Sequence, residues 1–140
     1  MHEYVTELLL KNAEYTLDDG LLRLRDEYRA KGVPTLLTES LNELILIAKI
    51  KNPKNILEFG TATGCSGIAL LLACPKARLT TIEKFKKSAD EAAKNFERFG
   101  VSGRVKQIIG NAVETAQDLT NDFDFVFLDC NKSKYKDLLP

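Results

Sequence analysis

Asn55-Ile-Leu-Glu-Phe-Gly-Thr-Ala-Thr-Gly-Cys-Ser66 is the stretch that decides the fold. An apolar run from Ile56 to Phe59 stops at Gly60, a second glycine follows at Gly64, and an apolar segment of helical length runs from Ile68 to Ala73. This order predicts a strand, a glycine loop and a helix, the first βα unit of a nucleotide-binding α/β fold. Glycine suits such a loop because it tolerates positive φ and lets a ligand approach the backbone closely.

The spacing of this loop separates it from a dinucleotide-binding fingerprint. A dinucleotide-binding Rossmann loop reads G-x-G-x-x-G, whereas this loop reads E-x-G-x-x-x-G, with Glu58 two residues before the first glycine. A carboxylate there favours a ligand with an ammonium group, such as the methionine end of S-adenosylmethionine. The carboxylate of that ligand could bind the Ser66 hydroxyl and the free N–H groups that begin the next helix. An ordinary βα turn with two structural glycines is the alternative.

The composition is that of one globular domain. The chain has 140 residues, of which 44% are hydrophobic and 29% are charged. Twenty basic and twenty acidic side chains give a formal net charge of zero, so no overall field favours nucleic acid or an anionic membrane. The longest apolar run, Ile68 to Cys74, is too short to cross a bilayer, and the three cysteines form no CxxC pair. We therefore expect a cytoplasmic protein with no membrane partner, disulfide framework or zinc site.

The first 52 residues are predicted to form helices that precede the sheet. Apolar residues recur at helical spacing over residues 3–13, 21–31 and about 38–51. Thr38 or Ser40 is the predicted N-cap of the third helix, and lysines near its end suit the helix dipole. The simplest role for the first two helices is packing.

Residues 53–140 alternate between strand and helix patterns. Strands are predicted at residues 56–59, 78–82, 105–109 and 123–128, and helices at residues 68–73, 86–99 and directly after residue 112. The last strand is nearly continuous in apolar residues, which predicts burial on both faces. We therefore predict an α/β fold: one domain over residues 1–140, with a doubly wound, parallel, Rossmann-like sheet behind N-terminal helices.

Residues with ligand-binding chemistry stand at the end of each predicted strand. They are Gly60, Glu83, Gly110 and Asp129. Ligands of parallel sheets bind at the carboxyl ends of the strands, so these residues predict a single site. Glu83 follows the glycine loop by about twenty residues, where a carboxylate can accept hydrogen bonds from both ribose hydroxyls of a nucleoside.

With these residues placed, the sequence resembles the class I S-adenosylmethionine-dependent methyltransferases. Within them it is similar to the metal-dependent O-methyltransferases, the family of catechol O-methyltransferase and its bacterial relatives. The resemblance covers about residues 21–139 and rests on Val33-Pro34, I-L-E-F-G-T-A-T-G-C-S, Ile82-Glu83, Gly110-Asn111-Ala112 and F-V-F-L-D-C-N-K-S-K-Y. In the last segment, Asp129, Lys132 and Tyr135 keep the family's D-x-x-K-x-x-Y pattern.

The resemblance implies a binding site for S-adenosylmethionine. Glu58 and Ser66 would hold the methionine end and Glu83 the ribose, while the turn at residues 110–112 would flank the adenine. The family has an aspartate in this turn, so Asn111 is a departure. The implied cofactor-binding residues are Glu58, Gly60, Thr61, Gly64, Ser66, Glu83, Gly110, Asn111, Ala112 and Asp129.

The resemblance also implies a magnesium-assisted transfer of a methyl group. Asp129 would be one ligand of the Mg²⁺, a hard cation that lowers the pKa of the acceptor hydroxyl. Lys132 would be the general base, with its own pKa lowered by the cation. The expected acceptor is a small catechol-like or phenol-like molecule or a hydroxylated tRNA uridine, and the expected assembly is a homodimer.

The length of the chain leaves two other functions open. The family's sheet continues for three more strands, which carry its other two metal ligands, so we expect this sequence to be a truncated chain. A non-catalytic module that binds a nucleoside or S-adenosylmethionine is one alternative. A nicotinamide-binding Rossmann protein is another, and the absent G-x-G-x-x-G motif disfavours it. A basic patch of Lys132, Lys134 and Lys136 would favour an RNA acceptor.

Overall fold

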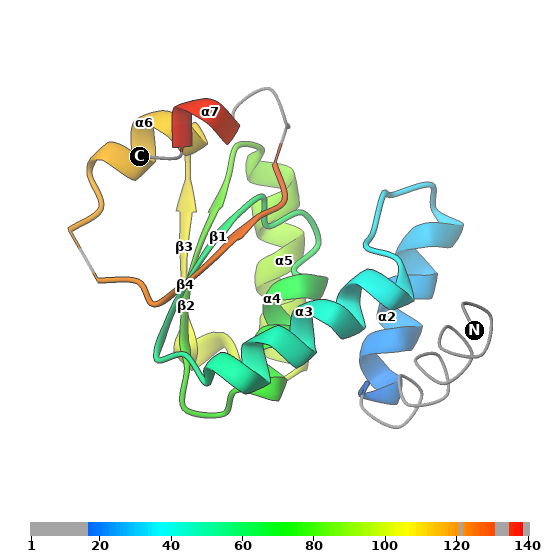
Figure 1. The fold of residues 1–140 in the computed structure, drawn as a ribbon. Helices are drawn as coiled ribbons and strands as arrows, with labels where there is room; N and C mark the ends of the chain where they lie inside the picture. The colour runs from blue at the N-terminus through cyan, green and yellow to red at the C-terminus, as the bar shows by residue number, and fades with distance from the viewer. Residues whose placement is uncertain (1–16, 121, 131–134, 139–140) are drawn as a thin grey trace.

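The computed structural model describes residues 17–120, 122–130 and 135–138 of the chain (Figure 1). The elements are α2 (Asp19–Ala30), α3 (Thr38–Lys51), β1 (Asn55–Phe59), α4 (Cys65–Ala73), β2 (Arg78–Glu83), α5 (Lys86–Arg98), a 3-10 turn (Ser102–Arg104), β3 (Val105–Ile109), α6 (Ala112–Gln117), β4 (Phe125–Leu128) and α7 (Tyr135–Leu138). The helix predicted over residues 3–13 lies outside the described residues.

The strands form one parallel sheet in the order β3-β2-β1-β4. The register places Phe59 of β1 beside Ile82 of β2 on one side and beside Leu128 of β4 on the other. The chain therefore leaves β1 toward β2 and later returns to the opposite side of β1. Such a switch point opens a crevice at the carboxyl ends of the two strands on either side of it.

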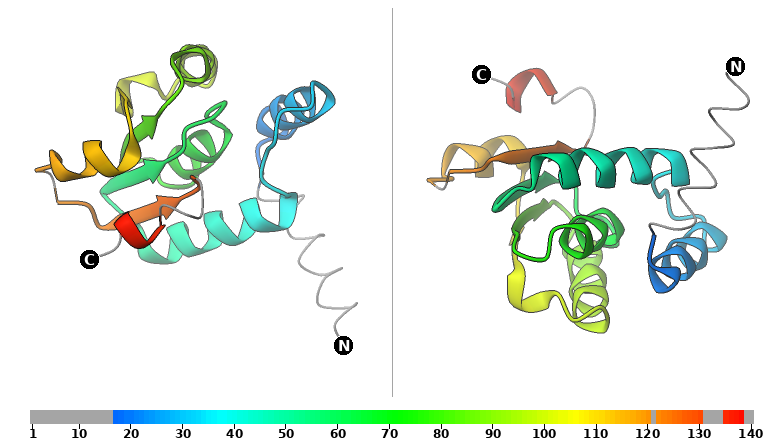
Figure 2. Two further views of the ribbon diagram at one scale, coloured as in Figure 1. Left: turned by 90° about the horizontal axis from the view of Figure 1, so that it is seen from above. Right: turned by 60° about the horizontal axis from the view of Figure 1, so that its bottom comes forward.

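Helices cover both faces of the sheet, which confirms the predicted doubly wound α/β fold (Figure 2). Successive β1 side chains point to opposite faces: Ile56 packs in the core beneath α4 and α5, whereas Leu57 and Phe59 pack in the core beneath α6. Both faces of β1 are thus closed to water, and the strand is buried from Ile56 to its last residue.

The last strand differs from its prediction in two ways. It begins at Phe125 rather than at Phe123, because the Asp124 carboxylate turns to accept hydrogen bonds from the N–H groups of Lys54 and Asn55. It is also not buried on both faces: Val126 is 53% exposed. Within the part of the chain that the structure describes, β4 pairs with β1 alone and is therefore an edge strand.

The predicted N-cap of α3 is also wrong. Leu37 occupies the N-cap position and makes no side-chain cap, while Thr38 is already the first helical residue. The Thr38 hydroxyl instead accepts a hydrogen bond from the guanidinium of Arg25 on α2. A long-range contact thus replaces the local cap that the sequence favours.

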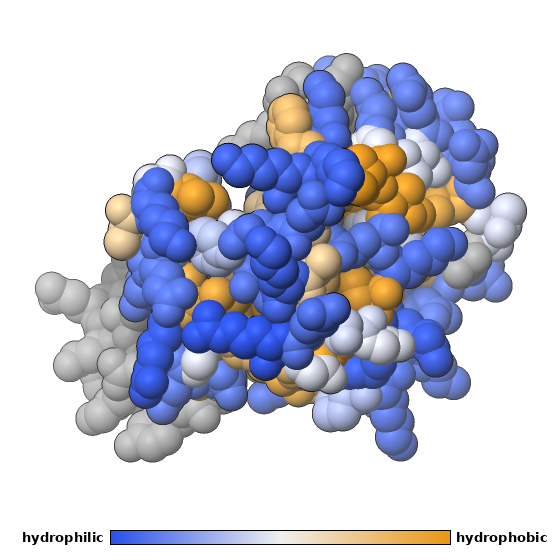
Figure 3. Space-filling view, turned by 180° about the vertical axis from the view of Figure 1, so that it is seen from behind, coloured by the Kyte–Doolittle hydropathy of each residue, from blue (hydrophilic) through white to orange (hydrophobic). Residues whose placement is uncertain are grey.

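The surface is mixed in polarity. In the view from behind, hydrophilic side chains cover most of the face and apolar side chains show between them (Figure 3). No helix among the described residues is long and apolar enough to cross a membrane. Cys65, Cys74 and Cys130 are free thiols.

Candidate functional site

The loops that follow β1 and β4 touch each other at Gly60. This glycine has φ +97°, and a Cβ atom on it would lie 2.3 Å from the carbonyl oxygen of Asp129. The Asp129 N–H donates to the carbonyl of Phe59 at 2.9 Å, which extends the sheet to the end of both strands. Only glycine fits this close approach of two backbones, so the crevice has a fixed and narrow floor.

A cavity of about 390 Å³ opens beside this floor, across the carboxyl ends of the strands. Six of the predicted cofactor-binding residues line it, and they come from the ends of all four strands. These residues are Gly60, Glu83, Gly110, Asn111, Ala112 and Asp129. The structure thus brings into one cavity residues that are up to 69 positions apart, counting from Gly60 to Asp129.

Glu83 is the most firmly held acid of this cavity. Its Oε1 accepts the N–H of Phe85 and its Oε2 accepts the N–H of Ala62, both at 2.9 Å. The side chain is buried at the tip of β2, and the two donors come from two different loops. Each carboxylate oxygen has further lone pairs, so the fixed carboxylate can accept two hydrogen bonds from a ligand.

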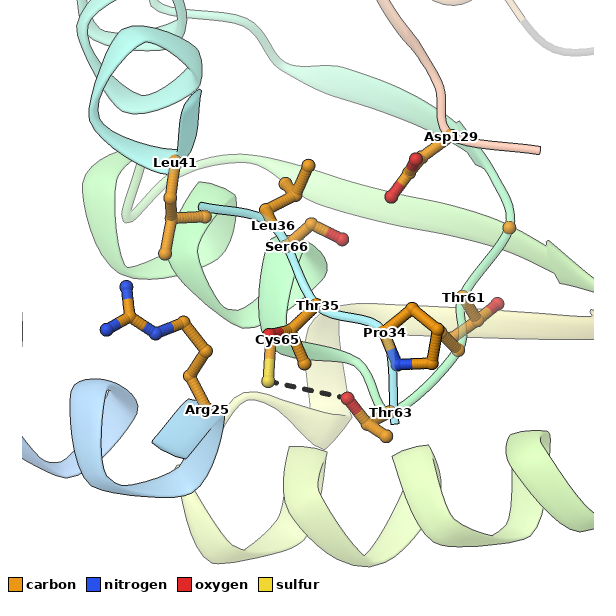
Figure 4. A pocket seen from close by; sticks show the side chains of 12 residues that line it. Arg25, Pro34, Thr35, Leu36, Leu41, Thr61, Thr63, Cys65, Ser66 and Asp129 are labelled. Atoms are coloured by element: carbon orange, nitrogen blue, oxygen red, sulfur yellow. Dashed lines mark hydrogen bonds between the residues drawn. The ribbon is translucent and has the colours of Figure 1, made fainter. Parts of the chain in front are cut away.

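A second, smaller cavity of about 30 Å³ adjoins the first and shares Gly60, Ala62 and Asp129 with it. Figure 4 shows side chains that line the smaller cavity. Thr61 and Ser66 line it from the glycine loop and α4. Gly64 lines neither cavity: it has φ +84° and forms the N-cap of α4.

Glu58 is fully buried and lies behind the smaller cavity, among hydroxyl groups. Ser66 donates to its Oε1, and Thr81 donates to its Oε2 at 2.7 Å. Thr81 has only one hydroxyl proton, so Thr61, whose Oγ1 lies 2.6 Å away, must donate to Thr81. Burial outweighs these bonds and raises the pKa of Glu58 to about 7. Any effect of Glu58 on a ligand would therefore act through Ser66 and Thr61.

Asn111 begins the turn that follows β3. Its Oδ1 accepts the N–H of Val113 at 3.0 Å, which makes it the N-cap of α6. The amide nitrogen of the side chain remains as a hydrogen-bond donor at the cavity. An aspartate in the same cap would offer no such donor, so the departure from the family pattern changes the hydrogen bonds that this turn can make.

Asp129 lines both cavities with an exposed side chain, and partial desolvation raises the pKa of its carboxyl group. Among the described residues, no group of three or more His, Cys, Asp or Glu side chains could hold a metal ion. A Mg²⁺ ion at Asp129 would need ligands from elsewhere, and the residues that the structure describes do not form its site. Lys132, the predicted general base, lies outside those residues, as does Lys134.

Packing is the simplest role predicted for the N-terminal helices, yet they form one wall of the smaller cavity. Arg25 of α2 and the segment from Pro34 to Leu36 line it. Arg25 is only 7% exposed, although a charged residue on an amphipathic helix usually faces water. The periodicity of the helix does not distinguish Arg25 from its exposed neighbours. The extended Val33-Pro34 segment was the available sequence signal that a wall of the smaller cavity lies here.

The chain is similar in sequence to known proteins. A sequence model of a family described as O-methyltransferase matches residues 21–139. A catechol O-methyltransferase of Niastella koreensis is 36% identical over 126 residues, which cover 84% of this chain and 57% of that protein.

Two solved structures resemble the chain as well. The O-methyltransferase TomG from Streptomyces achromogenes, in complex with SAM, has a TM-score of 0.75 and 32% identity, with 84% of this chain and 56% of that chain covered. The SAH-bound methyltransferase PaMTH1 of Podospora anserina has a TM-score of 0.83 and 27% identity, with 99% and 62% covered. This chain therefore spans little more than half the length of these relatives.

Proposed function

The chain belongs to the O-methyltransferase family. We propose that it binds S-adenosylmethionine at the carboxyl ends of its strands and takes part in the transfer of a methyl group from this cofactor to a hydroxyl oxygen. The larger cavity takes the adenosine half of the cofactor, and the methionine half points from there toward the smaller cavity, which Thr61 and Ser66 line.

The Glu83 carboxylate is the observation that carries this proposal. Its two oxygens are fixed by the N–H groups of Phe85 and Ala62, and it lines the larger cavity. Two fixed, coplanar acceptors suit the two neighbouring hydroxyls of a ribose, because each hydroxyl donates to one oxygen. A carboxylate already held in place also loses little conformational entropy on binding.

The charges around the cavities favour this cofactor over a dinucleotide. Three carboxyl groups, those of Glu58, Glu83 and Asp129, lie close enough for the last two to raise the pKa of the first. A sulfonium and an ammonium group are stabilised by such surroundings, whereas the pyrophosphate of a nicotinamide dinucleotide is repelled. These charges disfavour the nicotinamide-binding alternative.

The chemistry divides between the cofactor and the protein. The sulfonium of S-adenosylmethionine supplies an activated methyl group, so the protein has to hold an acceptor oxygen in line with it. Asp129 lies between the two cavities, at the level where the methionine and adenosine halves would join. We assign Asp129 to the acceptor side of the cofactor; Lys132 as the general base stays a prediction.

The acceptor is proposed from the names of relatives. Those names include catechol O-methyltransferase and putative caffeoyl-CoA O-methyltransferase, so we propose a small, catechol-like acceptor. Nothing in the zero net charge favours a tRNA acceptor. The tRNA acceptor, the Mg²⁺ ion, the homodimer and the cytoplasmic location stay predictions.

Calorimetric titration of the chain with S-adenosylhomocysteine, and separately with NAD, tests the cofactor. We expect only S-adenosylhomocysteine to bind. Glu83→Gln should weaken this binding by about tenfold or more, because the amide turns one acceptor into a donor that faces a backbone N–H. Glu97→Gln, on the exposed side of α5, is the matched control and should bind as the native chain does. Binding of NAD alone would refute the proposal.

Methyl transfer needs a separate assay, because a module that only binds the cofactor would pass the titration. Labelled S-adenosylmethionine is incubated with the chain and catechol, with and without Mg²⁺, and label in the catechol is counted. Transfer that Glu83→Gln lowers at limiting S-adenosylmethionine supports the enzyme. Tight binding of S-adenosylhomocysteine without any transfer would favour the non-catalytic module.

A further inference from the structure

A buried hydrogen-bonded chain connects α5 to the glycine loop. Asn95 of α5 is 6% exposed, and its Nδ2 donates to the carbonyl oxygen of Thr63 at 2.8 Å. The same nitrogen donates its second hydrogen to the hydroxyl of Tyr28 at 2.9 Å. Both hydrogens of this amide are therefore used, one on the loop and one on α2.

Tyr28 carries the connection onward to α2. Its side chain is 7% exposed, and its hydroxyl, which accepts from Asn95, lies 3.3 Å from Oε1 of Glu91 and donates to it. Tyr28 stands three residues after Arg25, so both side chains point from the same face of α2. Arg25 lines the smaller cavity opposite the glycine loop. The two walls of that cavity are thus tied together through one asparagine.

The glycine loop needs such support because its backbone is strained. Ala62 has φ +46°, a left-handed conformation that a residue with a Cβ atom adopts only when its surroundings hold it. Its N–H is one of the two donors that fix Glu83. The next residue is Thr63, whose carbonyl Asn95 holds. A displacement of Thr63 would turn the Ala62 N–H away from the Glu83 carboxylate.

We propose that Asn95 is a positioning residue, which holds the glycine loop in its cofactor-binding conformation and couples it through Tyr28 to the N-terminal wall of the site. The part that concerns affinity rests on the proposed function. The part that concerns the loop is a property of the protein without ligand.

Asn95→Leu tests both parts, since leucine has a similar size and no donor. Gln107→Leu is the matched control: Nε2 of Gln107 donates to the carbonyl of Ala89 on the same helix at 3.0 Å, with no link to the loop. We expect both variants to lose stability in urea unfolding, and Asn95→Leu to lose more, because Asn95 is buried and donates two hydrogen bonds whereas Gln107 is partly buried and donates one. Only Asn95→Leu should weaken S-adenosylhomocysteine binding, by about tenfold, the loss expected when one buried hydrogen bond no longer supports the bound conformation.

Amide hydrogen exchange in the chain without ligand gives an independent readout. The Ala62 N–H is bonded to Glu83 and the Gly64 N–H to the carbonyl of Thr61 at 2.8 Å. Both amides should exchange faster in Asn95→Leu than in the native chain. In Gln107→Leu they should exchange at the native rate. Equal exchange and equal affinity in the two variants would overturn the proposal. Faster exchange in a chain whose native form binds no S-adenosylhomocysteine would support the positioning role while refuting the proposed function.

Tyr28→Phe tests the coupling and serves if Asn95→Leu does not fold. It removes only the hydroxyl, so Asn95 keeps its bond to Thr63 and loses its second partner. We expect a severalfold loss of affinity and a moderate rise in exchange at residues 62–64. Native affinity together with native exchange would show that Tyr28 is not coupled to the loop.

Discussion

At the scale of single residues, the candidate site is held in place before any ligand enters. Glu83, Glu58 and Asn111 each make hydrogen bonds within the protein that fix the direction of their polar atoms. Gly60 removes the side chain where the loops after β1 and β4 meet. Preorganisation of this kind favours binding because less side-chain freedom is lost.

Glu58 should make the stability of the protein depend on pH. Its pKa is about 7 in the folded chain against an ordinary value of 4.5, so the folded state binds the proton more tightly. Its contribution is therefore complete below about pH 4.5 and is lost as the pH rises through 7, by up to about 3 kcal/mol. Glu58→Gln cannot ionise and should remove this slope.

Urea unfolding of both chains at pH 5 and pH 8 measures the effect. The difference in the free energy of unfolding between the two pH values should be larger in the native chain than in the variant. Parallel pH profiles would show that Glu58 ionises as freely in the folded chain as in the unfolded one.

At the scale of elements, the sequence predicted the helices and strands well and their polar contacts poorly. The β1 to α5 pattern could be read from local periodicity, and the strand ends Gly60 and Glu83 from the chemistry that follows each strand. Asn95 could not be found in this way, because its partners Thr63 and Tyr28 lie 32 and 67 positions away. One sequence carries local periodicity but does not show which distant groups pair.

The exposure of β4 was predicted wrongly for the same reason. The run from Phe123 to Leu128 is apolar enough for a strand covered on both faces, and composition alone does not say whether a neighbour is present. The clamp of Asp124 on Lys54 and Asn55 is another contact between distant segments, and it moves the start of the strand.

Arg104 should stabilise the end of α4. Its guanidinium donates to the carbonyls of Leu71, Cys74 and Ala77 at 2.9–3.1 Å, at and just beyond the C-terminus of the helix. These acceptors otherwise lack a helical partner. We expect Arg104→Met to lower the free energy of urea unfolding by about 2 kcal/mol.

Arg98→Met is the control for this change. Arg98 makes an ion pair of 3.7 Å with Glu27, and both side chains are 53% exposed. Loss of such a pair should cost less than about 0.5 kcal/mol. Equal effects of the two substitutions would contradict a capping role for Arg104.

At the scale of the whole molecule, the two faces of the sheet are unequally packed. Among the residues that the structure describes, the core beneath α4 and α5 contains nineteen buried residues, whereas the core beneath α6 contains three, Leu57, Phe59 and Ile82. Neither β4 nor α6 has a buried residue among those described. The site therefore lies where a well-packed half of the molecule meets a loosely packed one.

Hydrogen exchange over the whole chain should reveal this division. We expect the slowest amides in β1, β2 and α4 and much faster exchange in α6 and β4, because regions with few buried contacts open at lower free energy. Mass spectrometry of peptic peptides measures it. Protection of β4 equal to that of β1 would contradict the expectation.

Because Glu58 is buried away from water, its carboxyl group can be observed by infrared spectroscopy. Below pH 7 this carboxyl group carries a proton, and it is fully buried with only hydroxyl groups for partners. The C=O stretch of a protonated acid differs from that of a carboxylate. At about pH 6, acids with ordinary pKa values are already ionised. An infrared difference spectrum between pH 6 and pH 8 should therefore contain the C=O vibration of this buried acid behind the site, with no dye, isotope or mutation.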